Sequence, residues 1–330
     1  MNNHLLTTAL TSVLVLGVTP FLGASEPGIK DFPAELTAQV ATMRAELAKN
    51  GHTFQVEVNP AMQYSLDEIC GTKVELRPPG DQAHASEQAL TSVAEGTGTL
   101  IIPAQFVGWF SSVKNQGGCG SCWAFSTIAS LEGAVLKKYG YPEGQVNADG
   151  SITTSGDVTI LSEQQLLSCN PYGFTCNGGW YAFDMLDPAN LDRGAGFYQG
   201  AIPATDFTYV AADVACSPHT TTRYTAVNLW GYVGSGSASI DAIKTAIIRC
   251  GSVSALVYAD KYFQGYHGGV FTATSTSTST NHAITLVGWD DTKGAWLLKN
   301  SWGNQWGIDG FMWIKYGANN VGTWPAWVLN

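Results

Sequence analysis

The first clear hydrophobic period of the chain lies between Pro33 and Gly51, where apolar residues recur at steps of four and three. This spacing is typical of one amphipathic helix, with Pro33 at its first position and Gly51 as its stop. The apolar residues are Leu36, Val40, Met43 and Leu47.

A short strand and a helix start are predicted in the next segment. Apolar and polar residues alternate over residues 54–58, which is the period of a strand. Ser65 and Glu68 have the spacing of a capping box ahead of Ile69. After Arg77 the composition becomes polar and poor in large apolar residues, so residues 78–99 are expected to form a linker open to proteolysis. An ordinary interdomain linker is the alternative.

Near the start of the chain, residues 9–24 form an apolar run that resembles an export signal, although no Lys or Arg precedes it. Polar residues and Pro20 interrupt the run, so it is too broken for a membrane span of about 20 apolar residues. We expect cleavage after Ala24, which makes residues 1–24 a signal peptide. An uncleaved anchor is the alternative.

A second helical period follows Ser121, a residue suited to an N-cap, and closes at Lys137, Lys138 and Gly140. Its apolar positions are Ala124, Ile128, Leu131, Val135 and Tyr139. Cys122 therefore lies in the first turn of a long buried helix. The positive end of the helix dipole stabilises a thiolate there.

The pair Cys119 and Cys122 is compatible with four kinds of site. A thioredoxin-like redox site is disfavoured because no strand and helix of that fold precede Cys119. A zinc site is disfavoured because Cys169 and Cys176 are too widely spaced, so we expect no metal and no cofactor. A structural disulfide for one cysteine and a nucleophile for the other remain.

A nucleophilic thiolate needs a base, and the chain beyond the linker contains only His219, His267 and His282. The first two lie in polar or glycine-rich surroundings typical of exposed loops. His282 opens an apolar strand predicted over 283–289, which would hold its imidazole rigidly. Asn300 could orient one ring nitrogen, and Trp302 could shield that hydrogen bond from water.

Composition excludes two classes of partner. The chain of 330 residues has a net charge of −10 and only 13% charged residues, so it lacks the basic field that nucleic acid or an anionic membrane requires. Its length exceeds a single core, so two packed units are expected.

Five blocks in order resemble the papain (C1) family of cysteine proteases over about residues 100–320. They are VKNQGGCGSCWAFS, LSEQQLLSC, CNGG, NHAITLVGW and KNSWGNQWG. His282 lies 160 residues and Asn300 178 residues after Cys122, against about 130–150 in the family signature. Insertions are therefore expected, and the polar stretches 147–159 and 272–280 are the obvious places.

The resemblance implies roles for four residues in catalysis. Cys122 would be the nucleophile and His282 the general acid and base, paired as thiolate and imidazolium. Asn300 would orient the imidazole, and Gln116 would donate its side-chain amide to the oxyanion hole together with the Cys122 N–H.

The resemblance also implies a substrate-binding wall. Gly178 and Gly179 would let an extended peptide lie alongside them. Trp180, Tyr181 and Ala283 would favour an apolar residue two positions before the cut bond, and Trp302 belongs to the same cleft. Burial of Trp180 and Tyr181 in the core is the alternative.

Two disulfides follow from the resemblance, Cys119 with Cys176 and Cys169 with Cys216. Cys250 is expected to be a buried free thiol. A Cys70–Cys250 pair in the precursor stays open because sequence alone cannot decide connectivity. Disulfides place the protein in an oxidising compartment outside the cytosol, whether extracellular, periplasmic or lysosome-like.

The resemblance implies an α+β, papain-like fold with two domains and an N-terminal propeptide. Residues 25–99 would form an inhibitory propeptide and linker, 104–218 a helical left domain, and 219–330 a β-barrel-like right domain. The expected protein is a secreted, monomeric cysteine endopeptidase made as a zymogen, with peptide substrates and no membrane attachment after processing. A catalytically silent papain-like binding protein and a thiol amidase or transglutaminase are the alternatives.

Overall fold

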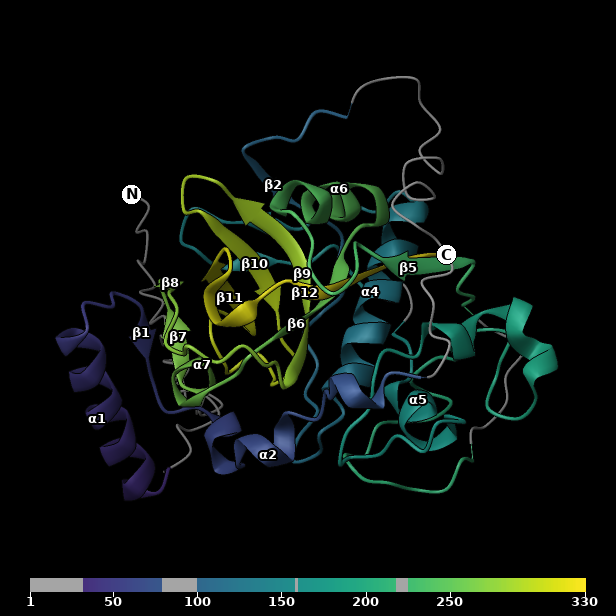
Figure 1. Ribbon diagram of the computed structural model, residues 1–330, viewed down its shortest axis with the longest axis horizontal. Coiled ribbons are helices and arrows are strands. Elements are labelled where there is room, and N and C mark those ends of the chain that lie inside the picture. The colour runs from purple at the N-terminus through teal and green to yellow at the C-terminus, as the bar shows by residue number, and fades with distance from the viewer. Residues whose placement is uncertain (1–31, 79–99, 158–159, 218–224) are drawn as a thin grey trace, which may run out of the picture.

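The computed structural model describes residues 32–78, 100–157, 160–217 and 225–330. The expected signal peptide at residues 1–24, nearly all of the linker and His219 lie outside these residues. Figure 1 shows a central sheet with the long helix α4 (Cys122–Lys138) beside it and helix α1 (Ala34–Lys49) at the edge of the molecule.

Within the described residues, the sheet has eight strands. They follow the order β5, β12, β6, β9, β10, β11, β8, and β2 also pairs with β9. Every pair is antiparallel except β11 with β8. The strands are β2 (Gln105–Val107), β5 (Leu229–Tyr232), β6 (Val253–Val257), β8 (Val270–Phe271), β9 (His282–Asp290), β10 (Ala295–Lys299), β11 (Phe311–Lys315) and β12 (Thr323–Leu329). The apolar strand predicted after His282 is thereby confirmed as β9, which is buried along its whole length.

Helix α4 packs against β9, β12 and β6. Its predicted apolar positions Ala124, Ile128, Leu131 and Val135 are buried, as the helical period indicates. Tyr139 departs from the prediction because the helix ends at Lys138, and the side chain is 64% exposed. Ser121 occupies the N-cap position, but its hydroxyl bonds the Tyr209 hydroxyl at 2.7 Å instead of capping the helix.

Shorter elements surround this core. The helical side carries α5 (Glu163–Cys169), η3 (Phe183–Leu186) and η4 (Pro188–Arg193), with the hairpin β3 (Gln145–Val146) and β4 (Ile152–Thr153). Helix α6 (Ile240–Cys250) packs on β12, β9 and β6, and η5 (Ala318–Asn320) precedes the last strand.

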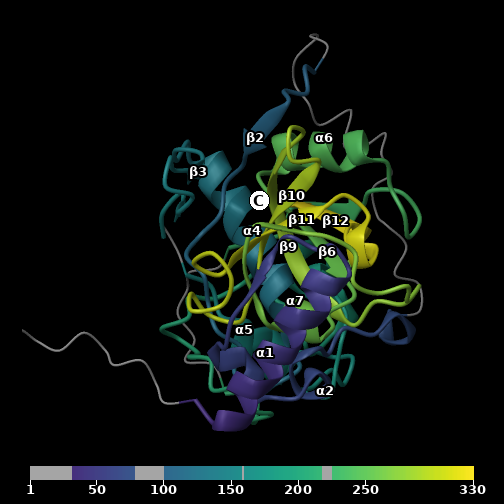
Figure 2. The same cartoon turned by 90° about the vertical axis from the view of Figure 1, so that its left-hand side faces the viewer.

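The N-terminal segment, residues 32–78, forms a chain of small elements laid along the body. It contains α1, β1 (Gln55–Val56), η1 (Pro60–Gln63), α2 (Leu66–Ile69) and η2 (Val74–Leu76). Figure 2 views α1 and α2 from the side, near α7 (Lys261–Gln264). Strand β1 pairs with β7 (Tyr266–Gly268). We call residues 32–78 the prosegment.

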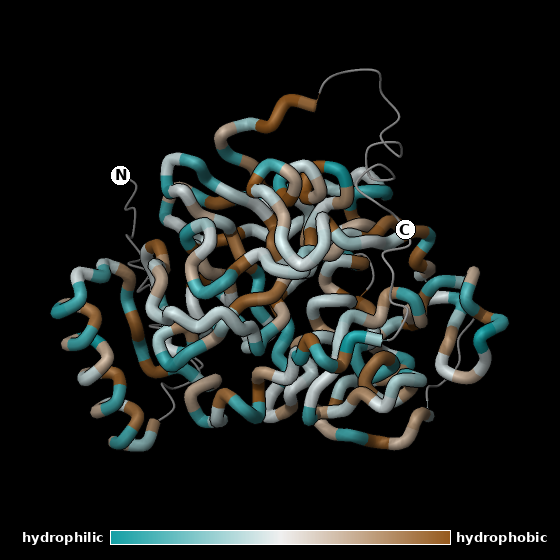
Figure 3. Tube along the Cα trace, in the orientation of Figure 1, coloured by the Kyte–Doolittle hydropathy of each residue, from teal (hydrophilic) through white to brown (hydrophobic). Residues whose placement is uncertain are grey.

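The local predictions for the prosegment agree with the structure except at Pro33 and in the length of the strand. Val40, Met43 and Leu47 are buried and Leu36 packs against the same core, and in Figure 3 hydrophobic and hydrophilic stretches alternate along the helix. Pro33 is the residue before the first helical one, not the first itself. The capping box of Ser65 and Glu68 is present. The predicted strand is reduced to two residues.

The described residues contain two large apolar cores. One joins the prosegment to the sheet, and the other surrounds α4 and α5. The division at residues 104–218 and 219–330 stays a prediction, and chain segments cross it: β2 pairs with β9, while Ala326 and Val328 belong to the core around α4. No helix of the described residues is long and apolar enough to cross a membrane.

Candidate active site

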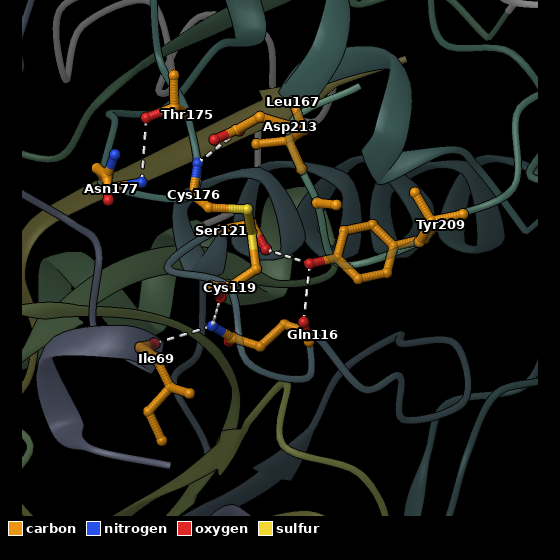
Figure 4. The surroundings of a disulfide bond; sticks show 12 residues. Ile69, Gln116, Cys119, Ser121, Leu167, Thr175, Cys176, Asn177, Tyr209 and Asp213 are labelled. Carbon is orange, nitrogen blue, oxygen red and sulfur yellow. Dashed lines mark hydrogen bonds between the residues drawn. A yellow bond between two sulfur atoms is a disulfide. The ribbon is translucent and has the colours of Figure 1, made fainter. Parts of the chain in front are cut away.

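Cys122 is the first residue of α4 and is fully buried. The loop before it is held by the Cys119–Cys176 disulfide and by the Gly120 N–H, which donates to the Cys176 carbonyl at 2.9 Å. Figure 4 shows this disulfide with Gln116 beneath it. Gly71 of the prosegment lies very close to this loop. A Cβ on Gly71 would be only 1.8 Å from the Gly120 oxygen.

His282, at the start of β9, reaches the site from the opposite side and is also fully buried. Its Nε2–H donates to Asn300 Oδ1 at 2.8 Å, which leaves Nδ1 as the nitrogen free for proton transfer. The Trp302 ring lies over the imidazole with a centroid distance of 4.7 Å. Asn300 Oδ1 also accepts the Ser301 N–H at 2.8 Å, so two donors hold the side-chain oxygen in place.

The environment of Cys122 favours the thiolate. Burial by itself raises the pKa of the thiol, but the charge of His282 and hydrogen bonds from the Ala283 N–H and the Thr72 hydroxyl outweigh it. The pKa falls from 9.0 to about 7. Nδ1 of His282 makes no hydrogen bond of standard geometry with the described residues, so its effect on the sulfur is mainly that of a nearby charge.

Gln116 is fully buried and its amide is held on every side. Its Nε2 donates to the Cys119 carbonyl at 2.7 Å and to the Ile69 carbonyl at 2.8 Å, while Oε1 accepts the Ser301 hydroxyl at 2.6 Å. Figure 4 shows the bond from Gln116 to Ile69. A prosegment carbonyl oxygen thus uses the donor that the family resemblance predicts for the oxyanion.

The prosegment continues past the thiol as an extended strand. The Gly179 N–H donates to the Gly71 carbonyl at 2.9 Å and the Lys73 N–H to the Gly179 carbonyl at 3.3 Å. On the opposite side, the Thr72 N–H donates to the Asn281 carbonyl at 3.1 Å. Residues 71–73 therefore lie between the helical and sheet sides of the site, over Cys122.

Gly179 is needed for a reason that the sequence did not indicate. A Cβ there would lie 2.6 Å from the Trp123 ring behind it. Gly178 has a φ of +137°, and a Cβ on it would lie 2.7 Å from the Gly71 oxygen. The first glycine of the pair therefore permits close approach of the prosegment, and the second permits close packing of the core.

The predicted wall residues Trp180, Tyr181 and Ala283 are at most 1% exposed with the prosegment in place. Trp180 Nε1 donates to the Tyr232 hydroxyl at 2.7 Å, which makes it part of the core around α4. Burial raises the pKa of Tyr181 well above its ordinary value, and the neighbouring Cys122 adds to this. Their role as substrate wall stays a prediction.

A buried ionic cluster lies around the same cavity as Asn300 and Ser301. Lys114 Nζ lies 2.8 Å from Glu132 Oε1 and 2.6 Å from Glu163 Oε1. Burial alone would lower the pKa of Lys114, but the two carboxylates raise it. Lys299, next to Asn300, donates to the Ser111 hydroxyl at 3.0 Å, and burial lowers its pKa to about 8.

The remaining predicted residues also have definite places. The structure contains both expected disulfides, Cys119–Cys176 and Cys169–Cys216. Cys70 and Cys250 are buried and unbonded, and burial raises the pKa of Cys250 to about 12. His267 is exposed and pairs with Glu57 of the prosegment at 3.1 Å.

Within the described residues, no group of three His, Cys, Asp or Glu side chains could hold a metal ion.

Sequence reasoning missed three residues of the site. Thr72 bonds the nucleophile, with its hydroxyl oxygen 3.0 Å from Cys122 Sγ, and nothing in its sequence context indicates this. Tyr209 donates its hydroxyl to the Gln116 carbonyl at 2.8 Å from 93 residues away. Ser301 could have been found, because it directly follows Asn300 within the KNSW block.

A buried thiol at a helix N-terminus, an imidazole fixed by an amide and a side-chain amide donor together define an enzyme with a cysteine nucleophile that attacks carbonyl carbon. Comparison with known proteins narrows the class. Residues 105–324 match the papain family of cysteine proteases. The chain therefore belongs to the papain family and is a cysteine-type peptidase.

The relatives cover most of the chain. Cathepsin K of Mus musculus is 29% identical over 290 residues, 86% of this chain and 80% of the relative. Zingipain-2 of Zingiber officinale is 34% identical over 204 residues, which are 61% of this chain and 80% of the relative. These matches confirm the family resemblance.

Solved structures agree in fold. A digestive procathepsin L 3 of Tenebrio molitor larval midgut superposes with a TM-score of 0.67 at 23% identity, covering 90% of each chain. A cysteine protease of Carica candamarcensis in complex with E-64 superposes with a TM-score of 0.55 at 29% identity. The match covers 69% of this chain and 99% of that one. The expected papain-like α+β fold with an N-terminal helical segment is confirmed. The disulfides fit a compartment outside the cytosol.

Proposed function

We propose that the chain is the zymogen of a secreted, monomeric endopeptidase that cuts peptide bonds through an acyl-enzyme on Cys122. The observation that carries the proposal is the buried thiol with its lowered pKa beside an imidazole fixed by Asn300. Both the nucleophile and its base are thus prepared before substrate arrives, which a catalytically silent binding protein would not need.

The geometry supports one order of proton movements. The Cys122 sulfur attacks the carbonyl carbon, and the oxygen takes the negative charge beside the Gln116 amide and the Cys122 N–H. The His282 Nδ1 proton passes to the leaving amine, which departs and leaves a thioester. His282 then takes a proton from water, the hydroxide attacks the thioester, and the carboxylic acid leaves.

The prosegment is the proposed inhibitor. Ile69 uses the Gln116 donor, and residues 71–73 cover the thiol between Gly179 and Asn281. Removal of residues 32–78 would free both the nucleophile and the oxyanion donor, while a cleaved signal at residues 1–24 accounts for the export that disulfides imply.

Two finer proposals concern substrates. Trp180, Tyr181 and Ala283 would favour an apolar side chain two residues before the cut, because their aromatic and methyl groups follow Gly178 and Gly179 or lie next to Cys122 and would line the space that residues 71–73 leave. Internal cleavage is favoured because the sequence between Cys176 and Cys216 contains no histidine that could bind a chain terminus.

Titration of the active-site thiol tests the function. The processed enzyme should hydrolyse a dipeptidyl amide, and a peptide-like epoxide should abolish this hydrolysis with one equivalent bound. Cys122→Ser should bind no epoxide and show no hydrolysis. Modification of the thiol without loss of peptide hydrolysis contradicts the proposal, while acyl transfer to amines in preference to water would indicate a transglutaminase.

Processing is tested separately with the precursor at graded pH. The wild-type precursor should shorten at low pH, where prosegment carboxylates become protonated, and Cys122→Ser should remain full length. Equal shortening of both proteins would exclude self-processing.

A further inference from the structure

Arg77 of the prosegment lies over the ring of Trp324, with its guanidinium carbon 4.6 Å from the ring centroid. This is the geometry of a cation–π contact, in which a positive charge is attracted by the negative face of an aromatic ring. Trp324 lies in β12, more than 240 residues further along the chain. The described path of the prosegment thus ends with a cation placed on an indole.

The position of Trp324 relates this contact to the predicted substrate wall. Its ring packs edge to face on Trp180, with a centroid distance of 5.9 Å, and on Tyr232, at 5.6 Å. Trp180 directly follows Gly179, the residue to which residues 71–73 are hydrogen-bonded. The indole therefore extends the aromatic wall that begins at the glycine pair.

The backbone holds this indole in an uncommon conformation. Trp324 has a φ of +46°, a left-handed value that is rare for a bulky residue and tends to occur at functional sites. Its N–H donates to the Gly236 carbonyl at 2.9 Å, and the lack of a side chain on Gly236 leaves room for the ring. The ring is thus fixed before any substrate binds.

We propose that Trp324 is a specificity-determining residue, whose ring accepts the positive charge of a substrate arginine or lysine once Arg77 has left. The cationic side chain is that of the residue two positions before the cut bond. The inference rests on the proposed function and extends its apolar preference, because an arginine stem is itself apolar.

The surrounding charge supports a cationic ligand. Residues 96–330 carry 15 acidic and 11 basic side chains, so the body of the enzyme is net negative. A positively charged substrate is attracted to such a protein and an acidic one is repelled.

Citrulline has the shape of arginine without its charge, so the pair isolates the cation–π contact. We would measure kcat/KM of the processed enzyme, with sites counted by epoxide titration, on three dipeptidyl amides that carry leucine, arginine or citrulline two positions before the cut. We expect the arginine substrate to exceed the citrulline substrate by about 3-fold to 10-fold. Trp324→Leu should bring this ratio close to one, and Trp324→Phe should keep part of it.

Tyr139→Leu is the matched control, because it removes an aromatic ring under Lys138 at the distant end of α4 and should leave the ratio unchanged. The inference is overturned if the wild type has equal kcat/KM values on the arginine and citrulline substrates, or if their ratio is unchanged in Trp324→Leu. In either case, hydrolysis of the leucine substrate would still support the proposed function. Failure to cleave any of the three substrates would instead contradict the proposed function.

A second measurement needs no enzyme variant. A synthetic peptide of residues 66–78 should inhibit the processed enzyme, and replacement of Arg77 by citrulline should weaken inhibition by about 3-fold to 10-fold. Equal inhibition by the two peptides overturns the inference even if the Trp324 variants fail to fold.

Discussion

The hydroxyl oxygen of Thr72 lies 3.0 Å from the sulfur of Cys122, and the two residues belong to segments on opposite sides of the expected processing linker. Thr72 is carried there by the hydrogen bonds of residues 71–73 to Gly179 and Asn281. The prosegment therefore covers the nucleophile and also stabilises its ionised form.

Removal of this hydroxyl should change the thiol in the precursor. Thr72→Val should raise the pKa of Cys122 by roughly 1 pH unit, because a hydrogen bond to a charged group contributes about 1.5–3 kcal/mol. The pH dependence of alkylation by iodoacetamide in the intact precursor measures this pKa. Thr42→Val, which removes an exposed hydroxyl from α1, is the control. An alkylation profile shared by the two variants would show that Thr72 has no influence on the thiol.

The oxyanion donor should depend on the residue that orients it. Gln116→Ala should lower kcat by about 100-fold to 1000-fold. Ser301→Ala should lower kcat by about 5-fold to 10-fold with little change in KM, because it removes one neutral hydrogen bond that holds Gln116.

Steady-state kinetics of the processed enzyme separate the two parameters. Ser279→Ala, an exposed position in the Thr/Ser-rich stretch, should match the wild type. A rise in KM alone for Ser301→Ala would assign that residue to substrate binding and not to positioning.

The ionic cluster should matter to stability. Lys114→Met leaves the carboxylates of Glu132 and Glu163 buried without their cation, which should reduce the free energy of unfolding by about 3–5 kcal/mol. Urea unfolding at pH 7 measures the loss. Lys138→Met, at an exposed position, should change the free energy by less than about 0.5 kcal/mol. Equal stability of the two variants would mean that water reaches the carboxylates.

Prosegment docking should weaken in acid in a way that depends on Glu46. Hydrogen bonds from Lys261 and Tyr262 lower the pKa of Glu46 from its ordinary value of 4.5. The pKa of Glu46 is lower in the docked prosegment than in the free prosegment. Ionised Glu46 therefore favours docking at pH values above its pKa in the free prosegment. This contribution is lost as the pH falls through the docked value.

Inhibition of the processed enzyme by added prosegment, measured from pH 7 to pH 4, tests this expectation. Glu46→Gln should inhibit more weakly at pH 7 and lose less of its inhibition in acid. Glu35→Gln, an exposed change on the same helix, should follow the wild type. Parallel pH curves for all three proteins would contradict a role for Glu46.

Local structure was accessible from the sequence because its causes lie within a few residues. The periods of α1 and α4 and the capping box at Ser65 depend on neighbours three or four positions away. Errors arose where distant contacts decide the outcome. The Ser121 hydroxyl bonds Tyr209 instead of its own helix, and the strand around Val56 is limited by its pairing with β7.

Each residue of the predicted catalytic set lies in a short block of typical composition, so the roles of Cys122, His282, Asn300 and Gln116 could be predicted by resemblance alone. What only the tertiary structure decided was which atoms meet. The prosegment path past Thr72, the occupied Gln116 donor and the contact of Arg77 with Trp324 join segments far apart in sequence. No local period or motif encodes such contacts, because they arise when the sheet and α4 bring distant segments together.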